Sequence, residues 1–128
     1  MKVRLALAAL AISVSPALAI DFGTVLKDRD GNAYLDCARA DPVTQACRET
    51  TPMTLGRLIV GALDKSDAGV KWQDRTKVGK LQEKVMSGAD VALDASEILM
   101  IEAALEKGDF RNYVVLQVAK LIDPASIK

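Results

Sequence analysis

The first 19 residues constrain the fold most, because they have the organisation of a secretory signal and would leave the chain before it folds. Two basic residues, Lys2 and Arg4, precede an apolar run of about the length found in such signals. Pro16 then breaks any helix, and Ala17-Leu18-Ala19 places small residues where a signal peptidase reads them. We therefore expect cleavage after Ala19 and a single small domain over residues 20–128.

Two alternatives to a cleaved signal stay open. The apolar run is shorter than the ~20 residues that a spanning helix needs, and Ser13, Ser15 and Pro16 interrupt it. Its weak hydrophobicity nevertheless permits a slowly released membrane anchor, and the segment could also be an ordinary helix of the folded domain. Cleavage would leave the chain in the periplasm or outside a bacterial cell, with no stable membrane span.

The two cysteines, Cys37 and Cys47, agree with export. They lie ten positions apart in a polar stretch that we expect to be an irregular loop. In an oxidising compartment such a pair predicts a disulfide, and closing the loop would stabilise the fold by roughly 2–3 kcal/mol. Two free thiols in a cytosolic protein are the alternative. A redox motif would place the cysteines closer together at a helix start, and a metal site would need further ligands.

Turn residues and helical periodicity predict a mainly α (α+β) fold, with an N-terminal β-hairpin followed by a compact bundle of about four helices. Residues 22–36 are typical of the hairpin, with Asp30-Gly31-Asn32 at its turn. Gly88 is typical of a helix end, and Asp94 with Glu97 has the spacing of a capping box. The apolar positions that we expect on the inner faces of the helices are Leu55, Leu58, Ile59, Ala62, Leu63, Val78, Leu81, Val85, Ile98, Ile101, Ala104, Leu105, Val114, Val118, Leu121 and Ile122.

The sequence nominates no enzyme. Histidine is absent, which excludes Ser-His-Asp and Cys-His catalysis and His-ligated zinc. No phosphate-binding glycine loop or serine elbow is present, so neither an envelope hydrolase nor a ligand-binding enzyme has a supporting motif. The stretch from Asp28 to Asn32 begins like a calcium loop, but Ala33 and Arg39 stand where glycine and glutamate are required. We expect no catalytic residue, no metal and no cofactor.

Charge is unevenly distributed, although 17 basic and 17 acidic residues cancel. Residues 71–84 have a net charge of +3 and residues 90–109 a net charge of −5. The overall balance argues against nucleic acid as a partner. The two segments either lie side by side, where exposed ion pairs contribute little, or Glu102 and Glu106 form a docking face for an oppositely charged protein. We expect both glutamates to be exposed.

Four groups of short motifs cover most of the chain after the signal and resemble small uncharacterised phage and prophage proteins. The groups are Asp21-Phe22 with Leu26-Lys27-Asp28 and Asp30-Gly31; Thr54-Leu55-Gly56 with Ala62-Leu63; Val91-Ala92-Leu93-Asp94-Ala95-Ser96-Glu97 with Ile98 and Ile101; and Val114-Val115 with Gln117 and Leu121-Ile122. Those proteins begin near the position of Asp21, without a signal or a cysteine loop. The resemblance implies an accessory protein that contacts the host or assists assembly, and it transfers no site residues.

The leading hypothesis is a small, exported, non-enzymatic protein-interaction domain that binds another protein in the bacterial envelope, and the resemblance to phage proteins implies a phage-derived accessory. The alternative is a cytoplasmic phage accessory, assembly or host-regulating protein, whose first residues are a mis-assigned start or a helix of the fold. Export separates the two hypotheses.

Overall fold

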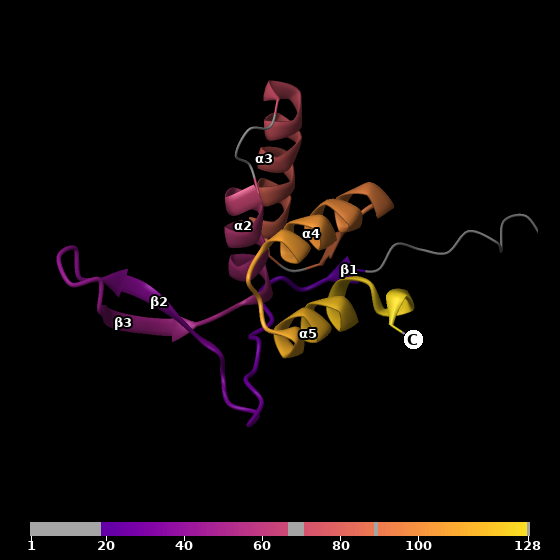
Figure 1. Cartoon of the computed structure of the whole chain (residues 1–128). Coiled ribbons are helices and arrows are strands. Elements are labelled where there is room, and N and C mark those ends of the chain that lie inside the picture. The colour runs from indigo at the N-terminus through magenta and orange to yellow at the C-terminus, as the bar shows by residue number, and fades with distance from the viewer. Residues whose placement is uncertain (1–18, 67–70, 89, 128) are drawn as a thin grey trace, which may run out of the picture.

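The structure is a computed structural model that describes residues 19–66, 71–88 and 90–127. In chain order its elements are the strands β1 (Ala19–Ile20), β2 (Leu35–Ala40) and β3 (Cys47–Pro52), the helices α2 (Leu55–Ser66) and α3 (Trp72–Met86), the strand β4 (Val91–Ala92), the helices α4 (Ala95–Lys107) and α5 (Asn112–Ile122), and the 3-10 turn η1 (Pro124–Ser126). This order confirms the predicted fold class, a mixed α+β chain in which a short hairpin region precedes four helices (Figure 1).

The core lies where α2 packs against α3 and α4, with α5 completing the bundle. Every predicted inner position on the helices is buried except Ile98 and Leu121, which are half-buried and pack against the core. Among the described residues no polar or charged side chain is buried. The helices are therefore held together by apolar burial, which is the expected source of stability for amphipathic helices of this length.

Both predicted helix boundaries around residue 90 are confirmed. Gly88 follows α3 with a φ of +105°, a backbone conformation that only glycine adopts easily. The Asp94 side chain accepts the backbone N–H of Glu97 at 2.8 Å, and the Glu97 side chain accepts the N–H of Asp94 at 2.9 Å. This capping box satisfies N–H groups that the first turn of α4 leaves without helical partners.

The N-terminal strand is tied to the connection between α3 and α4. β1 pairs antiparallel with β4, so that Ile20 lies opposite Val91, and Ile20 is only 3% exposed. The predicted cleavage point falls inside this strand, after the exposed Ala19, and a chain beginning at Ile20 keeps the buried side chain. Residues 1–18 of the predicted signal lie outside the described residues. Within the described ranges, no helix is long and apolar enough to cross a membrane.

The regular hairpin lies further along the chain than the sequence predicts. The predicted turn forms, because the Asp28 carboxylate accepts the N–H groups of Asp30 and Asn32 at 2.9 and 3.0 Å. The segments beside it, however, share a single isolated bridge, Lys27 to Ala33. The paired strands are β2 and β3 instead, in the stretch expected to be an irregular loop.

Candidate functional site

Residues 35–52, which we call the disulfide hairpin, extend away from the helices and supply no residue to the core (Figure 1). In the described part of the chain, β2 and β3 pair only with each other. A segment that buries no apolar side chain gains little from the hydrophobic effect. The order of the hairpin must therefore come from its own backbone pairing, its disulfide and its polar contacts.

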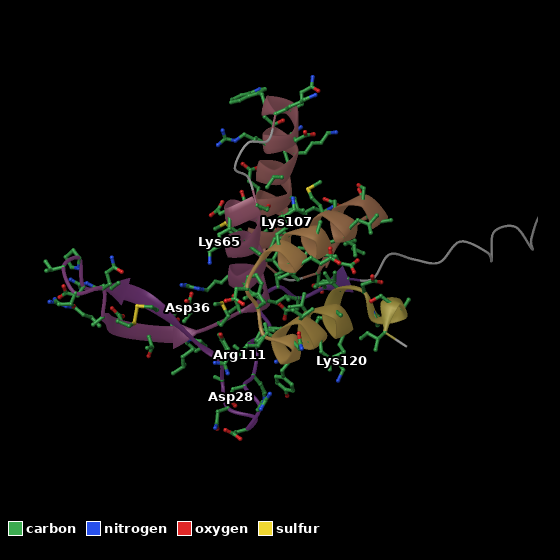
Figure 2. The ribbon with its side chains drawn as sticks, in the orientation of Figure 1. Asp28, Asp36, Lys65, Lys107, Arg111 and Lys120 are labelled. Carbon is green, nitrogen blue, oxygen red and sulfur yellow. A yellow bond between two sulfur atoms is a disulfide. The ribbon has the colours of Figure 1, made fainter. Side chains whose placement is uncertain are left out.

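Two irregularities in the pairing of β2 with β3 lie beside the cysteines. The register shifts between Cys37 and Arg39, where Ala38 is the extra residue of β2, and again between Arg39 and Ala40, where Arg48 is the extra residue of β3, as at β-bulges. Cys37 lies opposite Thr50, and Cys47 lies opposite Ala40. The structure contains the predicted disulfide between Cys37 and Cys47, whose Cα atoms are 5.7 Å apart (Figure 2). The bond joins the strands close to the tip and keeps the two strand ends from separating.

The tip of the hairpin is fixed by one carboxylate. Asp41 accepts the backbone N–H groups of Val43 and Thr44 at 2.9 and 3.0 Å, and its second oxygen pairs with the Arg48 guanidinium at 2.5 Å. The hydrogen bonds from Thr44 and Val43, helped by Arg48, lower the pKa of Asp41. Gln45 completes the turn with a φ of +62°. As a result Val43, which is 87% exposed, projects into solvent from a backbone whose conformation is fixed by these hydrogen bonds.

Backbone hydrogen bonds and one ion pair fix the root of the hairpin. Met53 donates its N–H to Tyr34 O at 2.6 Å, and Leu26 donates to Met53 O at 2.9 Å. The Arg57 guanidinium of α2 pairs with the Asp36 carboxylate of β2 at 3.1 Å. These contacts set the direction in which the hairpin leaves the helices.

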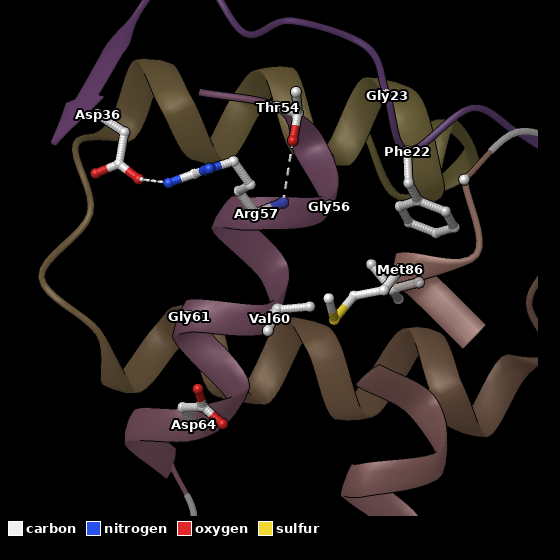
Figure 3. A pocket seen from close by; sticks show the side chains of 12 residues that line it. Phe22, Gly23, Asp36, Thr54, Gly56, Arg57, Val60, Gly61, Asp64 and Met86 are labelled. Atoms are coloured by element: carbon white, nitrogen blue, oxygen red, sulfur yellow. Dashed lines mark hydrogen bonds and ion pairs between the residues drawn. The ribbon is translucent and has the colours of Figure 1, made fainter. Parts of the chain in front are cut away.

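A cleft of about 460 Å³, the root cleft, lies beside this attachment (Figure 3). Figure 3 shows Phe22 and Met86 at one end of the cleft and Arg57, reaching toward Asp36, at the other. The residues that line it are Phe22, Gly23, Asp36, Thr54, Gly56, Arg57, Val60, Gly61, Asp64, Val85, Met86 and Gly88. The cleft has the size and the apolar character of a site for a small ligand or for a side chain of a partner.

The charged groups of the root cleft are already paired. Asp36 binds Arg57, and Asp64 accepts a hydrogen bond from the amide of Gln82 at 2.6 Å. Gly61 leaves open space on the α2 wall, since a Cβ there would meet nothing within 4 Å. Across the described ranges, no three metal-ligating side chains gather. The arrangement is suited to receiving an apolar side chain next to the hairpin.

The predicted docking residues Glu102 and Glu106 lie elsewhere, on α4 facing α5. They line a groove with α5 residues, and Glu106 is exposed. Glu102 is half-buried, so the prediction that both side chains are exposed is wrong for Glu102, which lies in the groove between α4 and α5 beside Asp123. The basic helix α3 instead reaches α4 through Lys84, whose Nζ lies 2.7 Å from Glu97 Oε1.

Partial burial raises the pKa of Glu102, and the nearby carboxylates of Asp123 and Glu106 raise it further. The structure therefore brings Glu102 beside other acids, and it does not bring the Glu102–Glu106 pair to the disulfide hairpin. Sequence reasoning missed Val43 and the root cleft. A signal for the tip was present in Asp41-Pro42, because aspartate and proline favour turns.

No protein-family model matches the chain, and no curated protein or solved structure shows significant similarity to it. The resemblance of its short motifs to phage proteins therefore stays a prediction. The assignment of a function rests on the disulfide hairpin and the cleft at its root.

Proposed function

We propose that this chain is an exported, non-enzymatic protein-interaction domain that binds another protein of the bacterial envelope through the disulfide hairpin. The observation that carries the proposal is the hairpin itself. It is ordered, covalently closed and outside the core, and it presents Val43 at its apex. A rigid, exposed segment of this kind is suited to contact a partner. It contributes no buried apolar side chain to the core that stabilises the helices.

The physical advantage of such a hairpin is preorganisation. Ordering a loop on binding costs roughly 0.5–1.5 kcal/mol for each immobilised side chain. The disulfide and the Asp41 contacts already order part of the hairpin in the free protein, so less conformational entropy is lost on binding. The bulge at Ala38 twists the strand edge, which disfavours addition of a further strand. The tip, with Val43 as an apolar anchor, is therefore the proposed contact point, and the root cleft accepts a neighbouring side chain of the partner.

The proposed location rests on two features. Residues 1–19 have the organisation of a signal peptide, and the disulfide is of the kind that persists in oxidising compartments. Mass spectrometry of a bacterial periplasmic extract, with and without reductant, tests both features at once. We expect a chain that begins at Ile20 and gains the mass of two hydrogens on reduction. An uncleaved cytoplasmic chain with two free thiols would favour the phage accessory protein instead.

Site-specific crosslinking tests the contact. A photoreactive amino acid at Val43 should capture one partner protein in cells, whereas the same group at Leu99, which is 65% exposed on α4, should not. Purified partner should then bind the unlabelled chain, and Val43→Asp should weaken that binding at least tenfold without a change in the circular dichroism spectrum. Equal capture from both positions, or full affinity of Val43→Asp, would contradict the proposal.

A further inference from the structure

The groove between α4 and α5, which we call the acidic groove, has an apolar floor and acidic side chains along its rim. Its volume is about 340 Å³, and buried side chains of both helices, among them Leu105 and Val118, form the floor. Glu102 and Glu106 project along the α4 side. A groove of this composition favours an apolar side chain flanked by positive charge.

The acids of this rim lack a cation. In the described part of the chain, no lysine or arginine lies within ion-pair distance of Glu102, Glu106 or Asp123. The partial burial of Glu102 and its proximity to Asp123 and Glu106 raise its pKa. A positive charge placed at the rim would therefore stabilise the ionised carboxylates, which the chain itself leaves close together.

The same chain carries a surface of complementary charge. The first turns of α3, residues 71–77, are exposed throughout, and the buried face of the helix begins at Val78. Figure 1 shows this end of α3 extending past α2. We call it the α3 tip. It presents Trp72, which is 78% exposed, between Lys71 and Arg75. A large aromatic side chain flanked by basic residues is the kind of anchor that dominates protein interfaces.

We propose that the acidic groove binds the α3 tip of a second copy of this chain. The indole of Trp72 enters the groove over Leu105 and Val118, while Lys71 and Arg75 approach Glu102 and Glu106. Burial of the indole supplies most of the affinity, and the charges set orientation and association rate. Each contact covers less area than a standard interface, so association is weak and concentration-dependent. It is independent of the disulfide hairpin and of the proposed function.

A tryptophan among basic residues is also typical of helices that bind anionic membranes. The acidic groove favours a second copy, because a membrane surface would leave the groove and its carboxylates without a partner. Membrane binding is therefore an outcome to be distinguished by experiment.

Sedimentation equilibrium and fluorescence test the proposal together, on the full chain as purified from bacterial cells. Trp72 is the only tryptophan, so its emission reports this contact directly. We expect the average mass to rise with protein concentration, and the emission to shift to shorter wavelength in parallel as the indole leaves water. Raising the salt from about 50 mM to about 500 mM should weaken association several-fold, because the screening length shortens.

Charge exchange gives the sharper test. Glu102→Lys/Glu106→Lys alters the groove, and Lys71→Glu/Arg75→Glu alters the α3 tip. Each double variant should be monomeric alone, whereas an equimolar mixture of the two should associate, because each supplies the charge that the other needs. Trp72→Ala should be monomeric, and the matched control Leu99→Ala, which removes another exposed apolar side chain, should associate normally.

Three results would overturn the proposal. One is a monomer at every concentration tested. Another is association that Trp72→Ala and both charge variants leave unchanged. The third is a shift of Trp72 emission on vesicles of anionic phospholipid in a chain that remains monomeric, which would assign the α3 tip to a membrane surface. Circular dichroism confirms that each variant is folded.

Discussion

Glu97 uses one carboxylate oxygen to join two helices. Its Oε1 atom lies 2.7 Å from Lys84 Nζ on α3 and accepts the backbone N–H of Asp94 at 2.9 Å. The contact between the basic and the acidic helix therefore depends on the side chain that closes the capping box of α4. Capping and ion pairing are coupled through this residue.

Substitutions should separate these two contributions. Glu97→Ala removes both and should lower the free energy of unfolding by about 1–2 kcal/mol. Glu97→Gln keeps an oxygen for the Asp94 N–H and loses the charge, so it should cost less than ~1 kcal/mol, as should Lys84→Met. Urea denaturation measures all three. Equal losses for Glu97→Ala and Glu97→Gln would show that the cap contributes nothing.

Removal of the disulfide should affect the hairpin more than the helices. No residue of the disulfide hairpin is buried, so Cys37→Ser/Cys47→Ser should retain the helical circular dichroism signal. The amide protons of β2 and β3 should exchange faster than in the native chain, because the strands are then held only by their hydrogen bonds. The loss of global stability should stay below the ~2–3 kcal/mol expected from loop closure. A parallel loss of helix would contradict this separation.

The pKa of Glu102 gives a prediction with a definite sign. Burial, followed by the carboxylates of Asp123 and Glu106, raises it above the ordinary value of 4.5. The folded state then binds the proton more tightly than the unfolded state, so stability falls as the pH rises from about 4.5 through the folded pKa. Glu102→Gln should raise Tm at pH 7, by no more than about 4 °C. The difference from the native chain should vanish at pH 4, and no difference at pH 7 would refute the assignment.

Two glycines of the same region should respond in opposite directions. Gly88 has a φ of +105°, so Gly88→Ala should destabilise the fold by about 1 kcal/mol through backbone strain. Gly79 lies inside α3, and a Cβ there meets nothing within 4 Å, so Gly79→Ala should stabilise by about 0.5–1 kcal/mol. Thermal unfolding of the two variants checks both signs.

Helix boundaries could be predicted here because their signals are local. Asp94 and Glu97 interact within one turn, and Gly88 acts through its own backbone. The disulfide hairpin could not be predicted from the sequence, because neither of its faces is buried. Without a buried face there is no selection for alternating apolar residues, and Thr50 and Thr51 are the only β-branched residues in β2 and β3.

The environment of Glu102 depends on contacts between helices. In the connection between α4 and α5, the Phe110 ring packs so closely over Gly108 that a Cβ there would lie 2.2 Å from it. Helical periodicity places Glu102 off the inner face of its own helix, as expected, but it contains no information about the helix that follows. The half-burial of Glu102, and with it the acidic groove, appears only when α4 and α5 are packed together.

The pairing of β1 with β4 determines when this chain can finish folding. Ile20 enters the core beside Val91. Its partner strand β4 is synthesised only after the whole of the disulfide hairpin, α2 and α3. Until that strand emerges, a nascent chain lacks the contact that closes its N-terminal edge, and its local helices alone are marginal. The N-terminal edge of the core therefore closes only after β4 has been synthesised.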